Sequence, residues 1–343
     1  MWVEPCPDFT PKKPVFLCIL ANTETAKIPN ISAAGKSPEL TDFTPAADAE
    51  LVETGRAISI KEPAMTPSGA PTPAVLTRAS MLLTGIPCLF INAGLNVRPK
   101  VPTIDINAMP GGDIRKGHAV ADANEIYMKS EALGRKLGKL SDFVIIGESV
   151  PGGTTTALAV MKALGYNGRV SSSFPDNPLG LKDKVAIEGM KRAGISFGDL
   201  KNKPMRAVEC LGDPMMAAAA GLADGLEGTK TILAGGTQMV SVLSIIKCLG
   251  LKRDISIATT RYVASDPTAN FREMTGMLGC RAYAADPGFG SSRFRGLRMY
   301  ENGDVKEGVG AGGAMFAAAM MGFSRKEFRE KAEEVCDSIF TVS

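Results

Sequence analysis

Short apolar runs typical of buried β-strands recur along the chain, and each is followed at once by small or hydroxyl-bearing residues. The runs span residues 15–21, 88–94, 143–147, 231–236 and 255–260. Helical patterns lie between several of them, at 73–83, 119–137, 180–193, 207–226 and 238–249. Strands that alternate with helices build βαβ units around a mainly parallel sheet. We therefore predict a three-layer α/β/α fold whose ligand site lies at the carboxyl ends of the strands, where the glycine-rich segments fall.

Two regions depart from this alternation. Residues 22–72 are rich in Pro, Ser, Thr and Ala, with helix-forming pieces only in their second half, and long loops are usually functional or disordered. The last twenty residues begin with Ser324, a capping residue, and form an amphipathic helix. We predict one Rossmann-like α/β domain over residues 1–343, with the terminal helix 324–343 in a small helical side lobe.

The composition argues against several classes of partner. A net charge of +3 and an aromatic content of 6% disfavour nucleic acid, and no apolar run is long enough to span a membrane. Seven scattered cysteines without a CxxC pair, in a chain whose first residues do not form a secretory signal, indicate a cytoplasmic protein with reduced thiols. A single histidine, His118, argues against a zinc site or a Ser-His-Asp triad, so we expect no metal.

Residues 142–165 lead from an apolar strand through a glycine-rich turn into a helix. Gly147 and Gly152 have the G-x-x-x-x-G spacing of a P-loop, but Gly153 stands where that motif needs lysine. Backbone N–H groups at such a helix start bind anions, and without the lysine a phosphate monoester suits the turn better than a triphosphate. An ordinary strand-to-helix turn is the alternative. Glu148 favours a functional role, because a carboxylate at a strand end beside an anion loop is costly unless it is used.

Two further clusters carry charged residues. In residues 305–315, Glu307 sits among glycines ahead of a helical segment, which suits a general base but is also common in solvated turns. In residues 177–190, Lys182 and Lys184 fall in the first turn of a helix, where cations oppose the helix dipole and therefore need an external anion. A solvated charged turn is the alternative for this segment as well.

Together the three clusters resemble the nicotinate-nucleotide:dimethylbenzimidazole phosphoribosyltransferase family, in the family's order. Residues 147–155 resemble its G-E-M-G-x-x-N-T-T segment, 180–184 its G-L-x-x-K segment, and 304–311 its R-L-G-E-G-[ST]-G-A segment. Residues 31–33, Ile-Ser-Ala, are similar to its G-V-S-A segment near the base pocket. The chain departs from these patterns at residue 153, a glycine where the family has Asn, and at residue 309, a valine where it has Ser or Thr. As a whole it is most similar to the shorter archaeal branch.

The resemblance implies a pentosyltransferase that moves 5-phosphoribose from nicotinate mononucleotide to a benzimidazole-type base, giving the α-ribazole phosphate of the cobamide lower ligand. It implies Glu307 as the general base and Glu148 as a group that supports the ribose or the cationic transition state. The substrate-binding residues would be Gly152, Gly153, Thr154, Thr155, Lys184, Gly308, Gly310 and Ser32. The reaction needs neither metal nor cofactor. The family works as a homodimer, for which residues 214–222 and 314–321 offer apolar surface unless they are core helices.

Two other functions stay open at this point. A Rossmann-type NAD-dependent oxidoreductase could hold a pyrophosphate on Gly235 and Gly236, although no G-x-G-x-x-G follows the first strand. A non-catalytic relative would bind the nucleotide and regulate or scaffold. The sequence leaves the identity of the base open.

Overall fold

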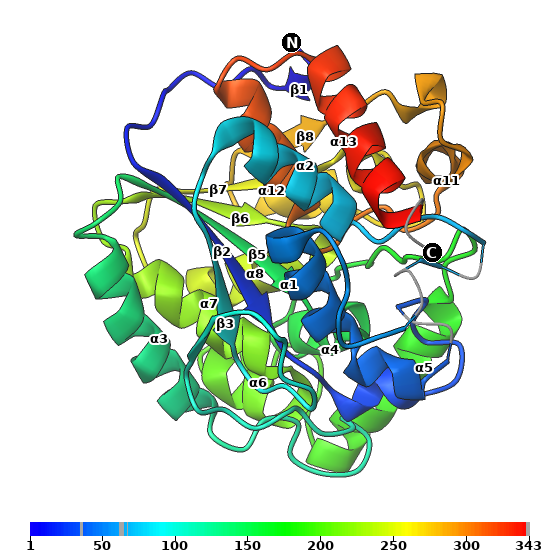
Figure 1. The fold of residues 1–343 in the computed structure, drawn as a ribbon. Coiled ribbons are helices and arrows are strands. Elements are labelled where there is room, and N and C mark those ends of the chain that lie inside the picture. Colours follow the sequence, from blue (N-terminus) through cyan, green and yellow to red (C-terminus); the bar gives the residue numbers. More distant parts are fainter. Residues whose placement is uncertain (35–36, 62–64, 67, 341–343) are drawn as a thin grey trace.

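The computed structural model describes residues 1–34, 37–61, 65, 66 and 68–340, and its centre is a sheet of eight strands (Figure 1). The strand order is β1-β8-β7-β6-β5-β2-β3-β4, and only β1 and β8 pair antiparallel. The bounds are β1 Val3–Glu4, β2 Pro14–Leu20, β3 Cys88–Asn92, β4 Thr103–Asp105, β5 Phe143–Ser149, β6 Lys230–Ala234, β7 Ile255–Thr260 and β8 Ala282–Ala285. The five predicted strands are confirmed as β2, β3, β5, β6 and β7. The other three escape prediction, because two to four residues are too few to give a periodic pattern.

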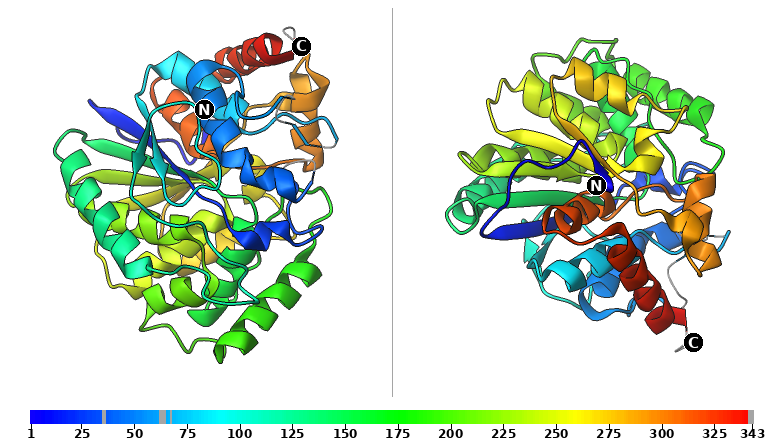
Figure 2. Two further views of the ribbon diagram at one scale, coloured as in Figure 1. Left: turned by 60° about the horizontal axis from the view of Figure 1, so that its bottom comes forward. Right: turned by 90° about the horizontal axis from the view of Figure 1, so that it is seen from above.

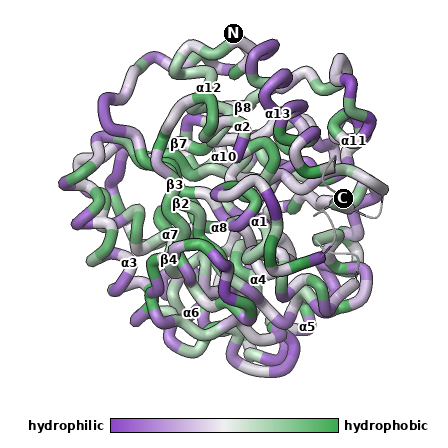
Figure 3. Tube along the Cα trace, viewed as in Figure 1, coloured by the Kyte–Doolittle hydropathy of each residue, from purple (hydrophilic) through white to green (hydrophobic). Residues whose placement is uncertain are grey.

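The central strand β2 is buried on both faces. Leu17 and Ile19 pack into the core on one side of the sheet, while Phe16, Cys18 and Leu20 pack into the core on the other side. Strands of this kind read as unbroken apolar runs, which is why they can be recognised in a sequence. Figure 3 shows the hydrophobic segments gathered in the interior, along the sheet and the helix faces that touch it.

Helices cover both faces of the sheet, as Figures 1 and 2 show. One face carries α3 Ala123–Leu137, α4 Gly153–Ala163, α5 Leu179–Ala193, α6 Pro204–Leu211, α7 Pro214–Gly225, α8 Thr237–Cys248 and α10 Phe271–Met277. The other carries α1 Thr44–Thr54, α2 Ala74–Thr84, α11 Arg295–Arg298, α12 Ala311–Met320 and α13 Arg325–Phe340, while the short α9 Arg261–Ala264 follows β7. The predicted three-layer, Rossmann-like α/β/α fold with a mainly parallel sheet is confirmed.

The prediction of one helix over residues 207–226 is wrong. These residues belong to two helices, α6 and α7, with Gly212 and Asp213 between them. Pro214 has no N–H to donate to a preceding turn, so it ends one helix and takes the first position of the next, where no donor is needed.

The terminal helix α13 packs on α2, and its Phe328 stacks on Trp2 with ring centroids 5.1 Å apart. The last three residues of the predicted helix, 341–343, lie outside the described residues. The single domain over residues 1–343 with this helix in a side lobe stays a prediction.

The two Met-rich stretches proposed as dimer surface are core helices. Residues 214–223 of α7 and 311–319 of α12 are buried, and only Met320 and Met321 at the end of the second stretch reach the surface. The predicted homodimer therefore loses this surface and stays a prediction. Within the described part of the chain, no helix has the length and apolar character needed to cross a membrane.

The order of the strands reverses between β2 and β5. From β2 the chain moves outward through β3 and β4, and then returns to the other side of β2 and moves outward through β5, β6, β7 and β8. Segments that leave the carboxyl ends of β2 and β5 therefore diverge and leave a crevice between them. Open α/β sheets bind their ligands at such a switch point.

Candidate active site

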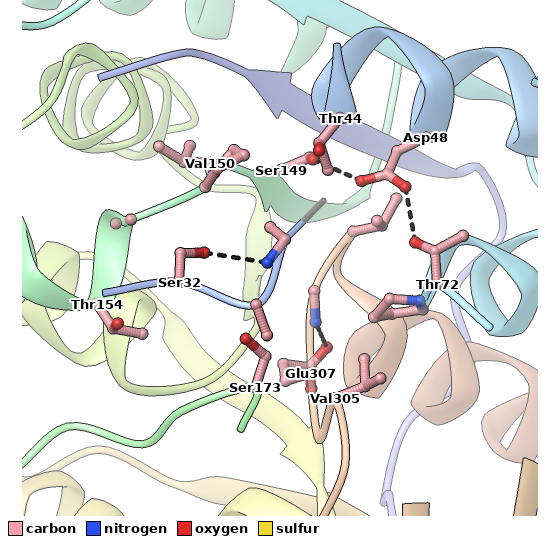
Figure 4. A pocket seen from close by; sticks show the side chains of 18 of the residues that line it. Ser32, Thr44, Asp48, Thr72, Ser149, Val150, Thr154, Ser173, Val305 and Glu307 are labelled. Carbon is pink, nitrogen blue, oxygen red and sulfur yellow. Dashed lines mark hydrogen bonds between the residues drawn. The ribbon is translucent and has the colours of Figure 1, made fainter. Parts of the chain in front are cut away.

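A cavity of about 540 Å³ opens at this crevice. It is lined by the segments that follow β5 and β6, by residues 31–34 with one face of α1, and by residues 305–309 ahead of α12 (Figure 4). The predicted position at the carboxyl ends of the strands is the position that the cavity occupies.

Glu307 lies in the wall of the cavity with its carboxylate held by backbone amides. The N–H groups of Thr260, Gly308 and Gly312 donate to it at 3.0, 3.1 and 3.1 Å, and the Thr259 hydroxyl donates at 3.3 Å. Burial raises the pKa of Glu307 to about 7, and the amide hydrogen bonds oppose that rise. A carboxyl group whose pKa lies near the working pH can take up a proton and release it again, as a general base must.

Two close backbone approaches hold Glu307 in place, and both require glycine. A Cβ on Gly312 would lie 2.2 Å from the carbonyl carbon of Thr259 and 2.7 Å from the Glu307 carboxylate. Gly310 has a φ of +65° and faces Gly147 of β5, where a Cβ would lie 2.8 Å from the Gly147 Cα. The first turn of α12 can therefore sit against the strand ends and aim an amide at the carboxylate.

The end of β5 directs the side chains of Glu148 and Ser149 to opposite faces of the sheet. Glu148 faces α8 and is 2% exposed, and the Val150 N–H donates to its carboxylate at 3.1 Å. Burial raises the pKa of Glu148 well above its usual range, and the charges of Glu307 and Asp213 raise it further. A cation bound here would offset the repulsion among these carboxylates and favour their ionised forms.

The turn before α4 lies at the cavity, and within it the Gly153 N–H donates to the Val150 carbonyl at 3.1 Å. Gly152 caps the helix with a φ of +78°, and Gly152, Gly153 and Thr154 all line the cavity. A Cβ on Gly153 would lie 1.6 Å from the side-chain oxygen of Gln238, so the Gln238 side chain occupies the space that a larger residue at 153 would need. The positive end of the α4 dipole therefore faces the cavity.

Two buried lysines hold a serine segment against the same cavity. Lys182 Nζ donates to the Ser171 carbonyl at 2.7 Å, and burial lowers its pKa to about 7, with Lys306 lowering it further. Lys306 Nζ donates to the Ser172 carbonyl at 3.1 Å and pairs with Asp266 at 3.2 Å. Residues 171–173 line the cavity, so their hydroxyl and backbone groups are fixed from behind by charged side chains.

The structure does not bring Lys184 to the cavity. Lys184 is exposed on α5, whereas Lys182 is fully buried. Residues two apart on a helix lie roughly 200° apart around its axis, so only one of the two can face the core. In the described part of the chain, the lysines of the cavity lining are Lys61 and Lys306, and Lys182 supports the serine segment from behind.

A third buried carboxylate, Asp48 of α1, also lines the cavity. The Thr72 hydroxyl donates to one of its oxygens at 2.7 Å and the Ser149 hydroxyl to the other at 2.7 Å (Figure 4). Burial raises the pKa of Asp48 to about 6, and both hydroxyl hydrogen bonds oppose the rise. The sequence carries only a weak signal for this group, a lone aspartate among the alanines of residues 46–49.

Most of the predicted site residues meet at the cavity. Its lining includes Ser32, Glu148, Gly152, Gly153, Thr154, Glu307 and Gly308. Thr155 and Gly310 are buried nearby in the chain without being part of the lining. Cavity residues that the sequence did not single out include Asp48, Thr72, Ser149, Ser171, Ser172, Ser173, Gln238 and Lys306. The roles of all these residues stay predictions.

No family model matches the chain. UPF0284 proteins of two organisms, Methanosarcina mazei and Methanothermobacter thermautotrophicus, are similar to it over nearly their whole lengths. The first is 54% identical over 340 residues, which is 98% of this chain and 97% of the relative. The second is 46% identical over 339 residues, which is 96% of this chain and 94% of the relative.

Two solved structures from Thermus thermophilus share the fold. A nicotinate-nucleotide-dimethylbenzimidazole phosphoribosyltransferase matches with a TM-score of 0.61 and 15% identity, over 97% of this chain and 87% of that one. A structure named CobT matches with a TM-score of 0.60 and 15% identity, over 95% and 84%. The resemblance inferred from the three motifs is confirmed at the level of the fold, and the archaeal relatives fit the predicted shorter branch.

Proposed function

This chain belongs to the UPF0284 family of archaeal proteins, and we propose that it transfers 5-phosphoribose from nicotinate mononucleotide to a benzimidazole-type base. The observation that carries the proposal is Glu307, a carboxyl group with a pKa of about 7 that backbone amides fix in the wall of the cavity. The fold shared with a nicotinate-nucleotide-dimethylbenzimidazole phosphoribosyltransferase supports this choice of reaction. The product would be α-ribazole phosphate, the nucleotide of the cobamide lower ligand.

Glu307 would act on the base that receives the ribose. The unprotonated azole nitrogen attacks the anomeric carbon, and the bond from that carbon to the pyridinium nitrogen breaks. Nicotinate leaves with the electron pair, and because its ring nitrogen was cationic it needs no proton. The azole becomes cationic as the new bond forms, and Glu307 takes the proton from its N–H. The amides around Glu307 hold the carboxylate in one position for this transfer.

Glu148 would act on the sugar. The ribose carbon carries positive charge while the old bond is broken and the new bond is incomplete. Glu148 is 2% exposed at the end of β5. The low dielectric constant of its surroundings would strengthen the attraction between its ionised carboxylate and the positive charge on the ribose. The pyridinium ring of bound nicotinate mononucleotide is cationic and would favour ionisation of this carboxyl group, so substrate binding itself would prepare the negative charge that the transition state needs.

The phosphate would lie on the turn before α4. The Gly152 and Gly153 backbone and the Thr154 hydroxyl line this end of the cavity, and the serines of residues 171–173 line it as well. The position of residues 152–154 at a helix start suits a phosphate monoester. Lys182 and Lys306 hold the serine segment in place beside it.

The test is the reaction itself. The protein is incubated with nicotinate mononucleotide and a panel of benzimidazoles, phenols and purines, and the nucleotide products are identified by mass spectrometry. A product whose mass equals the base plus phosphoribose, together with free nicotinate, supports the proposal. Calorimetric binding of nicotinate mononucleotide without any product would favour the non-catalytic relative, and no binding at all would reject both.

A further inference from the structure

The proposed chemistry gives no task to Asp48, a buried carboxylate of the cavity. Asp48 lies on α1 and is 3% exposed, so little solvent screens its charge. Both of its oxygens accept hydroxyl hydrogen bonds, from Thr72 and from Ser149, each at 2.7 Å. All three residues line the cavity. A buried carboxylate is costly, so a cluster of this kind inside a ligand cavity indicates recognition.

Asp48, Thr72 and Ser149 form one wall of the cavity. The hydrogen bonds to Asp48 fix which groups of this wall donate and which accept. A hydroxyl group has one proton, and Thr72 and Ser149 each give theirs to Asp48. Their oxygens can then only accept a hydrogen bond from a ligand. Thr44, one turn earlier on α1, gives its proton to the Leu40 carbonyl at 3.4 Å and adds another acceptor. These three hydroxyl groups therefore present lone pairs to a ligand.

The position of this wall assigns it to the base and not to the phosphate. In Figure 4, Asp48 and Thr72 lie on the opposite side of the cavity from Thr154. Phe43, Ala47 and Met65 also line the cavity, and their apolar side chains suit a flat ring. An aromatic base with one polar edge matches such a pocket.

We propose that Asp48, Thr72 and Ser149 select bases that carry a hydrogen-bond donor, an amino or hydroxyl group, on the six-membered ring. This inference rests on the proposed function for the statement that a base occupies the cavity. Ring substituents of similar size are then separated by chemistry: an amino or hydroxyl group pairs with the wall, and a methyl group leaves buried acceptors unpaired.

A matched series of bases tests the proposal with the unaltered protein. Benzimidazoles with a methyl, amino or hydroxyl group at ring position 5 differ little in size, and their affinities are measured by calorimetry in the presence of nicotinate mononucleotide. The amino and hydroxyl compounds should bind about tenfold or more tightly than the methyl compound. The same order should hold for kcat/KM when product is measured by mass spectrometry. Equal affinities across the series would overturn the proposal.

Variants then assign the preference to the wall. In Asp48→Asn the new amide N–H donates to the hydroxyl of Thr72 or Ser149, and the proton of that hydroxyl turns toward the cavity. The preference for the amino and hydroxyl compounds over the methyl compound should therefore shrink to less than about threefold. Thr72→Val removes one acceptor at constant shape and should weaken the preference by itself, which covers the case in which the first variant does not fold. Asp8→Asn is the matched control, since Asp8 is paired with Arg281 at 2.8 Å on the surface and should leave the ratio unchanged.

Two outcomes separate this inference from the proposed function. A donor preference in binding, without any transfer to the bases, would support the wall and reject the transferase. Transfer to all three bases at equal kcat/KM would support the transferase and reject the wall. An Asp48→Asn protein that loses affinity for nicotinate mononucleotide but keeps the wild-type ratio would mean that the wall holds ribose hydroxyls, and would overturn the inference as well.

Discussion

Glu307 combines two opposing influences on one carboxyl group. Burial alone would keep it protonated, while three backbone N–H groups favour the charged form, and the result is a pKa of about 7. A group balanced in this way changes protonation state with little cost, which is what a proton acceptor in a cycling reaction needs.

Replacing Glu307 by Gln should lower kcat by about 10² to 10⁴-fold, since general-base catalysis contributes by this order. The affinity for nicotinate mononucleotide should change little, because the carboxylate acts on the other substrate. Single-turnover and steady-state kinetics with mass-spectrometric detection check both numbers. Near wild-type turnover would remove Glu307 from the mechanism.

The wild-type rate should rise with pH and level off above about pH 7, because only the deprotonated Glu307 can accept the proton. The Glu307→Gln protein should lack this rise. A pH profile of kcat between pH 5 and 9 measures it, and a wild-type rate that is flat through pH 7 would contradict the assignment.

Gly153 and Gln238 should behave as a coupled pair. Because a Cβ on Gly153 would lie 1.6 Å from the Gln238 oxygen, Gly153→Ala should raise the KM for nicotinate mononucleotide by displacing the turn before α4. Gln238→Ala vacates that space, so the double variant should recover part of the loss, with a coupling of about 0.5–3 kcal/mol in a double-mutant cycle. Strict additivity would show that the two residues do not compete for space.

At the scale of elements, α12 depends on glycines that no helix propensity would favour. Gly312 lets the helix approach the end of β7, where a Cβ would lie 2.2 Å from backbone that cannot move aside. Gly312→Ala should therefore lower both the thermal stability and kcat, since the Gly312 amide also donates to Glu307.

Gly276→Ala provides the matched control for this change. Gly276 lies in α10 with open space around its Cα, so alanine there should stabilise the protein by about 0.5–1 kcal/mol through helix propensity. Thermal denaturation of both variants decides the point: a Gly312→Ala protein as stable as the control would mean that α12 does not need the close approach.

The elements that the sequence predicts well share one physical property. The strands β2, β5, β6 and β7 are buried on both sides by helices, so each leaves an unbroken apolar run that local composition reveals. The break at Pro214 is hidden because the apolar pattern continues through it. Lys184 cannot be told from Lys182 in the sequence, because the phase of α5 around its axis depends on which side meets the core. The position of Asp48 in the site depends on the packing of α1 beside the end of β5. The sequence does not reveal it, because no local pattern contains this contact.

At the scale of the whole molecule, buried carboxyl groups in and near the cavity make the stability of the fold depend on pH. Burial raises the pKa of Asp48 and of Asp213 from 3.8 to about 6, and that of Glu307 from 4.5 to about 7. A carboxyl group with a higher pKa in the folded state holds its proton more tightly when folded, so its contribution to stability is lost as pH rises from its unfolded to its folded pKa.

The free energy of unfolding should therefore fall between pH 5 and pH 7, by up to about 1.4 kcal/mol per pH unit for each such carboxyl. Urea denaturation at several pH values over this window measures the slope. The range stops at pH 7 because the lowered pKa of Lys182, also about 7, contributes the opposite trend above it. Stability that rises from pH 5 to pH 7 would contradict the burial of these carboxyl groups in the native protein.

The pleat at the end of β5 separates this site into two parts that can change independently in evolution. Glu148 faces Gln238 on one side of the sheet, and Ser149 faces Asp48 on the other, although the two residues are neighbours in the chain. Under the proposed roles, substitutions in α1 and at Thr72 would therefore change the choice of base without changing Glu148, the group proposed to act on the sugar. Under the same proposal, relatives of this chain would differ in the base that they accept and would keep the same transfer chemistry.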